Sequence, residues 1–144
     1  MNVTRVFTLD EVRSLIPQIE ELVGELLMRQ ADVELLLAEL AEHSGTVPGT
    51  LRYERGDDEV VTALKQRLRR EVEAWDHGWR RVEALGGVVR DPRAGLVDFY
   101  GYVKGRLVWL CWAYGEDTLR GYEDLGGSLI TQLRLNPSAA VARS

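Results

Sequence analysis

The first third of the chain carries apolar side chains at alternating steps of four and three residues, the heptad spacing of a long helix that packs along one face. These positions are Val12, Ile16, Ile19, Val23, Leu26, Val33, Leu37 and Leu40, with Gln30 as the one polar break. Thr8 and Glu11 have the spacing of a capping box, so we expect a helix that starts at Thr8 and ends near His43. It would be about 54 Å long, with a kink near residues 13–17 because Pro17 removes a backbone donor.

A second helix is predicted after a loop at residues 44–57, which contains three glycines and a proline. Asp57-Asp58-Glu59 supplies a cap and favourable charge at its start, and Gly86-Gly87 ends it. One face of this helix is apolar and consists of Val61, Leu64, Leu68, Val72, Trp75, Trp79 and Val82. Two helices of this length joined by such a loop favour an antiparallel helical hairpin over residues 8–86.

Beyond residue 87 the pattern changes to that of strands. Leu96–Val103 and Arg106–Tyr114 flank Lys104-Gly105, which fits the two-residue turn of a β-hairpin. Val88-Val89 and Leu129–Leu135 are expected to add a third and a fourth strand. The sequence therefore predicts an α+β fold, in which a small antiparallel β-meander packs on the long helical hairpin.

The hairpin register sorts the strand side chains onto two faces. The apolar face, expected to pack on the helices, carries Val97, Phe99, Val103, Val108, Leu110, Trp112 and Tyr114. The mixed face carries Leu96, Asp98, Tyr100, Tyr102, Leu107, Trp109 and Cys111. Asp98 then lies opposite Cys111, just as Phe99 lies opposite Leu110.

Length and composition limit the class of protein. The 144 residues fit one domain, predicted over residues 1–135 with the meander at 87–135, followed by a disordered tail at 136–144. The net charge of −5 argues against nucleic-acid binding, and no apolar run reaches the roughly 20 residues of a membrane span. We expect a cytoplasmic protein, and its preference for Arg over Lys suggests a bacterial source.

The mixed face of the predicted sheet offers one candidate ligand site, formed by Asp98, Cys111, Glu116 and Glu123. A carboxylate raises the pKa of a neighbouring thiol, so this arrangement disfavours a nucleophilic cysteine. The alternative is that Cys111 is an ordinary buried cysteine of a strand. We assign no catalytic residue here.

Other charged groups do not make a site. Glu39 to His43 and Glu73 to His77 each place acids near a histidine, but the two groups would lie about 30 Å apart in a hairpin. We therefore predict no metal and no cofactor. The basic stretch from Lys65 to Arg70 is interleaved with acids, which favours a solvated helix face.

Several motifs resemble the prokaryotic family called domain of unknown function 2203. They are Phe7-Thr8-Leu9-Asp10-Glu11-Val12, Leu85-Gly86-Gly87-Val88-Val89-Arg90-Asp91-Pro92, Gly95-Leu96-Val97-Asp98-Phe99, Leu110-Cys111-Trp112 and Gly115-Glu116. The resemblance implies the fold but no activity, because none is established for the family. Where the family has a Trp-His-Glu stretch this chain has Gly121-Tyr122-Glu123, so no role of that histidine is carried over.

The predicted lengths suggest a partner for the helices. An eight-residue strand spans about 26 Å, roughly half of each helix. The uncovered apolar positions lie near the loop and comprise Val33, Leu36, Leu37, Leu40 and Leu64. We therefore expect a homodimer through the helices, in coiled-coil fashion, and a non-enzymatic homo-oligomeric scaffold or interaction protein. The alternative is a small-molecule or metal-binding protein, and a possible enzyme, that uses the Asp98 site.

Overall fold

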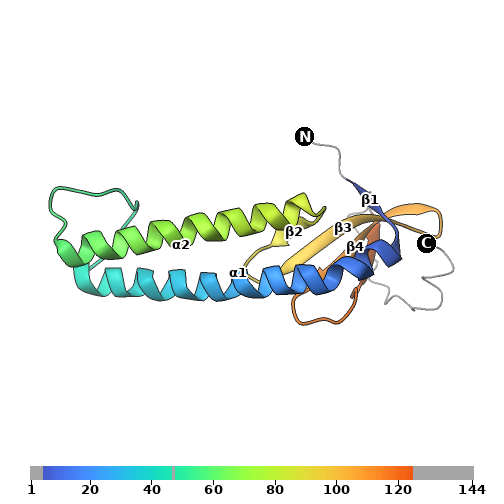
Figure 1. Cartoon of the computed structure of the whole chain (residues 1–144), viewed down its shortest axis with the longest axis horizontal. Helices are drawn as coiled ribbons and strands as arrows, with labels where there is room; N and C mark the ends of the chain where they lie inside the picture. The colour runs from blue at the N-terminus through green and yellow to red at the C-terminus, as the bar shows by residue number, and fades with distance from the viewer. Residues whose placement is uncertain (1–4, 47, 125–144) are drawn as a thin grey trace.

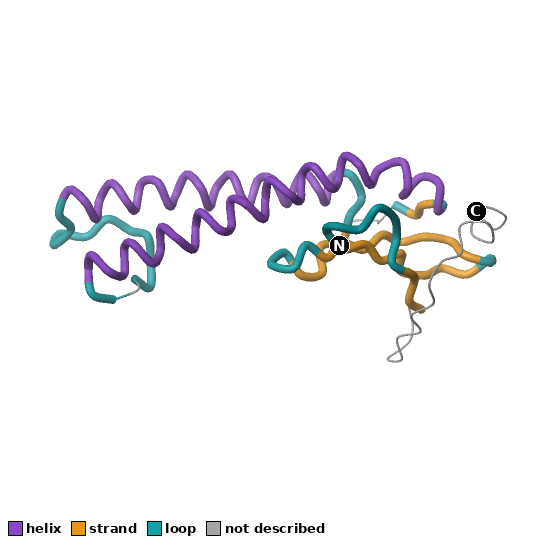
Figure 2. The backbone as a smooth tube through the Cα atoms, turned by 90° about the horizontal axis from the view of Figure 1, so that it is seen from below, coloured by secondary structure: helices purple, strands orange, loops and turns teal. Residues whose placement is uncertain are grey.

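The computed structural model describes residues 5–46 and 48–124 and has an α+β architecture (Figure 1). Two long helices lie side by side and run in opposite directions, and a small sheet lies against one side of them near one end (Figure 2). In chain order the elements are β1 (Val6–Phe7), α1 (Leu9–Ser44), α2 (Glu59–Ala84), β2 (Val88–Asp91), β3 (Leu96–Val103), β4 (Arg106–Ala113) and β5 (Gly121–Asp124).

The ends of α1 follow from local chemistry. Thr8 Oγ1 accepts a hydrogen bond from the Glu11 backbone N–H at 3.1 Å, and Glu11 Oε1 accepts one from the Thr8 N–H at 2.8 Å. This is the predicted capping box. At the other end Gly45 adopts φ 90°, a left-handed conformation that favours glycine, and its N–H donates to the Ala41 carbonyl. α1 continues through Pro17 as one helix, and the expected kink stays a prediction.

α2 begins as expected and makes polar contacts with α1 at two positions along the helices. Asp58 caps α2 by accepting a hydrogen bond from the Val61 N–H at 2.8 Å. The same Asp58 carboxylate lies 3.1 Å from His43 Nε2 at the loop end, and Arg29 lies 3.3 Å from Glu71 farther along the helices. These pairs connect the two helices near the loop and at mid-length.

Two separate apolar clusters hold the fold together. The larger one joins the first half of α1, the end of α2 and the inner face of the sheet, and includes Val12, Ile19, Val82, Phe99 and Trp112. The smaller one lies near the loop and contains Leu36, Leu40, Val61, Leu64 and Leu68, each at most 8% exposed, with Val33, Leu37 and Leu51 packed against it. One copy thus already buries Leu36, Leu40 and Leu64, so the burial of these side chains does not require a second chain, and the homodimer stays a prediction.

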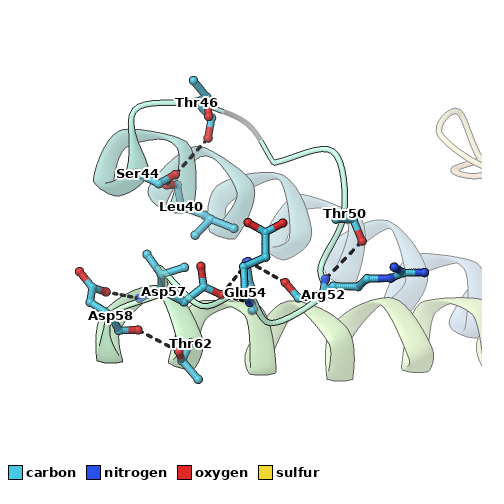
Figure 3. Close-up of polar contacts among 11 residues, drawn as sticks. Leu40, Ser44, Thr46, Thr50, Arg52, Glu54, Asp57, Asp58 and Thr62 are labelled. Carbon is cyan, nitrogen blue, oxygen red and sulfur yellow. Dashed lines mark hydrogen bonds and ion pairs between the residues drawn. The ribbon is translucent and has the colours of Figure 1, made fainter.

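The loop owes its place on this cluster to a buried lysine. Lys65 is only 3% exposed, and its Nζ donates to the Arg52 carbonyl at 2.7 Å and to Asp57 Oδ2 at 2.8 Å. The hydrogen bond from Lys65 also lowers the pKa of Asp57. Further hydrogen bonds within the loop and to the helix ends run through residues such as Ser44 and Glu54 (Figure 3). The interpretation of Lys65 as part of a solvated face is corrected accordingly.

The sheet is mixed, so the expected all-antiparallel meander is wrong in one respect. β1 pairs with β3 in parallel, with Val6 opposite Tyr100 and Phe7 opposite Gly101. Phe7 is buried and packs edge-on against Phe99 at 5.5 Å between ring centroids. Gly101 permits this close approach, since a Cβ there would lie 3.1 Å from the Phe7 carbonyl and 2.3 Å from the Leu110 side chain. Two residues give no alternation from which such a strand could be predicted.

The β3–β4 hairpin has the predicted register. Asp98 lies opposite Cys111, Phe99 opposite Leu110 and Val103 opposite Arg106. Lys104 and Gly105 both have positive φ, at 55° and 76°, as a two-residue hairpin turn requires.

The neighbouring strands differ in part from expectation. β2 extends the predicted Val88-Val89 strand to Asp91 and pairs antiparallel with β3. The outer strand beside β4 is β5, which the sequence did not indicate. The predicted strand at Leu129–Leu135 and the tail at 136–144 lie outside the described residues. Tyr114, expected on the apolar face, follows the end of β4 and is 45% exposed.

A substitution at the polar break in the α1 seam is expected to stabilise the protein. Gln30 Oε1 is buried without a hydrogen-bond partner among the described residues, although Nε2 donates to Glu34. Gln30→Leu should raise the free energy of unfolding by about 1 kcal/mol, because it removes an unsatisfied acceptor from an apolar seam. Urea denaturation measures this, with Gln66→Leu at an exposed α2 position as the control. An unchanged or lower stability of Gln30→Leu would contradict the seam packing.

Candidate functional site

All four sequence-predicted site residues line one pocket of about 700 Å³. Asp98 reaches it from β3, Cys111 from β4, Glu116 from the connection between β4 and β5, and Glu123 from β5. The remaining lining residues are Arg90, Leu96, Trp112, Thr118, Leu119, Arg120, Gly121 and Tyr122. Residues up to 33 positions apart, from Arg90 to Glu123, thus line one hollow.

Strand register explains why the central groups meet. Asp98 on β3 is paired with Cys111 on β4, and Cys111 is paired with Gly121 on β5. Their neighbours Val97, Phe99 and Trp112 are buried in the main cluster, so Asp98 and Cys111 project from the opposite face. Gly121 places no side chain beside Cys111, which leaves space next to the thiol.

The wall opposite the strands is built by the connection between β4 and β5. The Trp112 indole Nε1–H donates to the Glu116 carbonyl at 3.0 Å. The Arg120 N–H donates to the Cys111 carbonyl at 2.8 Å, and the Glu116 N–H donates to the Ala113 carbonyl at 3.1 Å. These bonds fold the connection back on β4, so that Glu116 and Arg120 border the same hollow.

Asp98 is the most unusual group of this pocket. Its residue is 6% exposed, and its nearest ion-pair partner is the Arg90 Nε, 3.6 Å from Oδ2. Burial raises the pKa of Asp98 to about 6, and the charge of Glu123 adds to the rise while Arg90 opposes it. The carboxylate is therefore charged near neutral pH at a cost in folding free energy.

Cys111 is held in its thiol form. Burial, together with the charges of Asp98 and Glu123, raises the pKa of Cys111 to about 12. The thiol donates its one proton to the Trp109 carbonyl at 3.7 Å, and Asp98 is a second acceptor within reach. A thiol with this pKa is a weak donor and not a nucleophile at neutral pH, in agreement with the expectation from its carboxylate neighbour.

Two arginines complete the charged rim. Arg120 Nε lies 3.3 Å from Glu116 Oε1. Arg90 lies over the Trp109 ring at 5.3 Å, and Trp109 stacks on Tyr100 at 4.0 Å between centroids. Arg90 was not identified from the sequence. The sequence feature that could have indicated Arg90 is its position two residues after Val88, because Val88 is the residue that pairs with Asp98.

The charged side chains that line the pocket are mostly acidic. Its carboxylates are Asp98, Glu116 and Glu123, and its cations are Arg90 and Arg120, which leaves an excess of negative groups. Within residues 5–46 and 48–124, no set of three or more His, Cys, Asp or Glu side chains is arranged to hold a metal ion. The same part of the chain contains no helix long and apolar enough to traverse a bilayer.

Comparison with protein-family models gives a match over residues 5–126, which includes both helices, the sheet and every pocket residue. The chain belongs to the family described as "Uncharacterized conserved protein (DUF2203)". No curated protein and no solved structure matches it. Membership in DUF2203 confirms the resemblance seen in the sequence, and it assigns no activity to the pocket of this DUF2203 protein.

Proposed function

We propose that this protein binds a small organic molecule through a cationic group that pairs with Asp98 in the pocket. The observation that carries the proposal is a carboxylate that is 6% exposed, borders a hollow, and has an arginine no closer than 3.6 Å. A buried charge is retained at a cost unless it is well paired. A perturbed carboxyl group in a pocket is a typical sign of a ligand site.

The charge balance favours an amine or guanidine over an anion. Arg120 is engaged by Glu116, and Glu123 makes the environment of Asp98 more negative. A cationic group between Asp98 and Glu123 would relieve the repulsion between these two carboxylates. The Cys111 thiol is neutral and would not repel such a group. The volume of about 700 Å³ lies in the usual range for small-molecule sites.

The side chains support binding rather than covalent catalysis. The one cysteine of the pocket keeps its proton because burial raises the pKa of Cys111 to about 12. Apolar wall residues such as Leu96, Leu119 and Tyr122 would cover the uncharged part of a ligand. We therefore propose a binding protein, located in the cytoplasm, as the function that these groups support best.

Thermal and urea denaturation with putrescine, agmatine and arginine as probes tests this proposal, with succinate as an anionic control. A probe present at about 100 times its Kd should raise the free energy of unfolding by about 2.7 kcal/mol. Glu123→Gln should weaken the effect, and Glu73→Gln, an exposed α2 position outside the pocket, should leave it unchanged. Failure of all three amines, or preferential stabilisation by succinate, would refute the proposal.

The homo-oligomeric scaffold stays a second proposal with less support. The apolar positions that motivated it, including Leu36, Leu40 and Leu64, are buried within one copy. Self-association through the helices is tested by sedimentation equilibrium at micromolar concentration. A monodisperse monomer would eliminate the homodimer, whereas a dimer would revive the scaffold.

A further inference from the structure

The exposed side of α1 carries its own apolar line. Met28, Ala31, Leu35 and Ala38 follow one another at steps of three, four and three residues, and all four are exposed. We call them the outer stripe. Met28 is 71% and Leu35 is 69% exposed, the highest values among the large hydrophobic residues of the described chain. At 3.6 residues per turn the stripe lies about half a turn from the buried Leu36 and Leu40 side of α1.

The outer stripe continues toward the sheet. The Tyr114 ring lies against α1 at Gly24, where an added Cβ would be 3.0 Å from the Tyr114 hydroxyl oxygen. Tyr114 is itself 45% exposed. Gly24 stands four residues before Met28, so the aromatic ring extends the same line. The heptad spacing and the small residues between the large ones are typical of a surface that receives another helix.

Acidic residues border the outer stripe. Glu25, Asp32 and Glu39 follow one side at seven-residue intervals and are exposed. Glu34 stands on the other side, where it accepts a hydrogen bond from Gln30 and pairs with the exposed Arg93 at 3.4 Å. Between residues 20 and 42 the one cationic side chain is Arg29, and it already lies 3.3 Å from Glu71. The field around the stripe is therefore negative.

This charge pattern distinguishes between possible occupants. A second copy that presented the same stripe would oppose acid to acid along the contact, in either helix direction, which is unfavourable for flanking positions. A second copy that presented its arginine-containing α2 would form a dimer, and the test below detects it as a dimer that the stripe variant abolishes. We propose that the outer stripe receives an amphipathic helix of another protein, with apolar residues at heptad spacing and Lys or Arg beside them.

Fluorescence polarisation of a labelled peptide tests the proposal on the full chain. The probe is a helical peptide of about 20 residues with Leu at the a and d positions and Lys beside them. Two further peptides serve as controls. One has Glu in place of Lys, and the other has the same residues as the probe in a scrambled order that is not amphipathic. We expect only the amphipathic basic peptide to bind, with an affinity that falls as salt is raised.

Variants locate the contact. The double substitution Met28→Ser with Leu35→Ser should weaken binding about tenfold or more, because it removes the two large apolar groups. Val60→Ser, at a 50% exposed apolar position on α2, should leave binding unchanged. Equal binding of the scrambled peptide, or equal binding by the double variant, would overturn the proposal. It would also be overturned if the wild-type chain formed a dimer that the double variant abolishes.

Discussion

Asp98→Asn is expected to stabilise the folded protein by about 2 kcal/mol near pH 8 and to abolish its response to amines. Burial raises the pKa of Asp98 from 3.8 to about 6, so the ionised carboxylate is less favourable in the folded chain than in the unfolded chain. About two pKa units correspond to roughly 3 kcal/mol, a value that already includes the opposing charge of Arg90, and the cost of burying a neutral amide reduces the gain to about 2 kcal/mol. A substitution that gains stability and loses ligand identifies a group kept for binding.

The stability gained by Asp98→Asn should depend on pH in one direction. Since the folded pKa exceeds the unfolded pKa, the stability contributed by Asp98 is fully present below 3.8 and is lost as pH rises through about 6. The advantage of Asp98→Asn should therefore be absent near pH 4 and complete above about pH 7. The amide cannot titrate, so the difference between the two proteins isolates this one group.

Urea denaturation of both proteins across this pH range measures the effect. Glu73→Gln is the matched control, because it neutralises an acid that is exposed on α2. Its stability difference from the wild type should stay within about 0.5 kcal/mol at every pH. Destabilisation by Asp98→Asn near pH 8 would mean that the Arg90 contact outweighs the burial of the charge, and the argument for a retained binding group would fail.

Lys65→Met is expected to destabilise the protein by about 2 kcal/mol. The substitution keeps a long apolar side chain in the smaller cluster but removes the ammonium that holds the Arg52 carbonyl and Asp57. The Arg52 carbonyl then loses this donor, and Asp57 Oδ2 keeps only the hydrogen bond from the Glu54 N–H. A lost hydrogen bond to a charged group costs about this amount. The loop should loosen from α2 as a consequence.

Denaturation and amide hydrogen exchange of residues 48–57 measure this prediction. Arg67→Met is the control, since it removes a cation from an exposed position two residues away on α2. It should change the free energy of unfolding by no more than about 0.5 kcal/mol. The prediction is contradicted if Lys65→Met is as stable as Arg67→Met and the loop amides stay protected from hydrogen exchange. The buried contacts of Lys65 would then not hold the loop on the helices.

The helices and the central hairpin were predictable because their signals are local. Thr8 and Glu11 form a capping box within four residues, and Lys104-Gly105 satisfies a turn that only a few residue types accept. The register of β3 and β4 then follows from the turn, and with it the position of Asp98 opposite Cys111. Each of these features depends on neighbours in the sequence.

What the sequence did not indicate depends on distant contacts. β1 is a strand only because Phe7 lies beside Gly101, and β5 contains a glycine and no alternation of apolar residues. The loop seemed a mere connection, yet Leu51 packs on the smaller cluster and Arg52 accepts a hydrogen bond from Lys65. The loop therefore covers part of the surface that was expected to contact a second chain.

The candidate site was likewise predictable in part. Strand alternation selected Asp98 and Cys111, whereas the hollow beside them depends on the folded connection between β4 and β5. Arg90 was missed because its place near Asp98 requires the pairing of β2 with β3. The chemical groups of this pocket were thus easier to predict from the sequence than the shape of the pocket.

The central claim is that the ionised Asp98 carboxylate receives the cationic group of a ligand. Isothermal titration of the most stabilising amine into the wild-type chain, repeated from about pH 8 down to pH 4.5, tests it most directly. We predict a constant affinity above about pH 7 and a fall of up to about tenfold per pH unit below 6, with no measurable binding to Asp98→Asn. An affinity that does not change with pH, or that survives in Asp98→Asn, would contradict the claim.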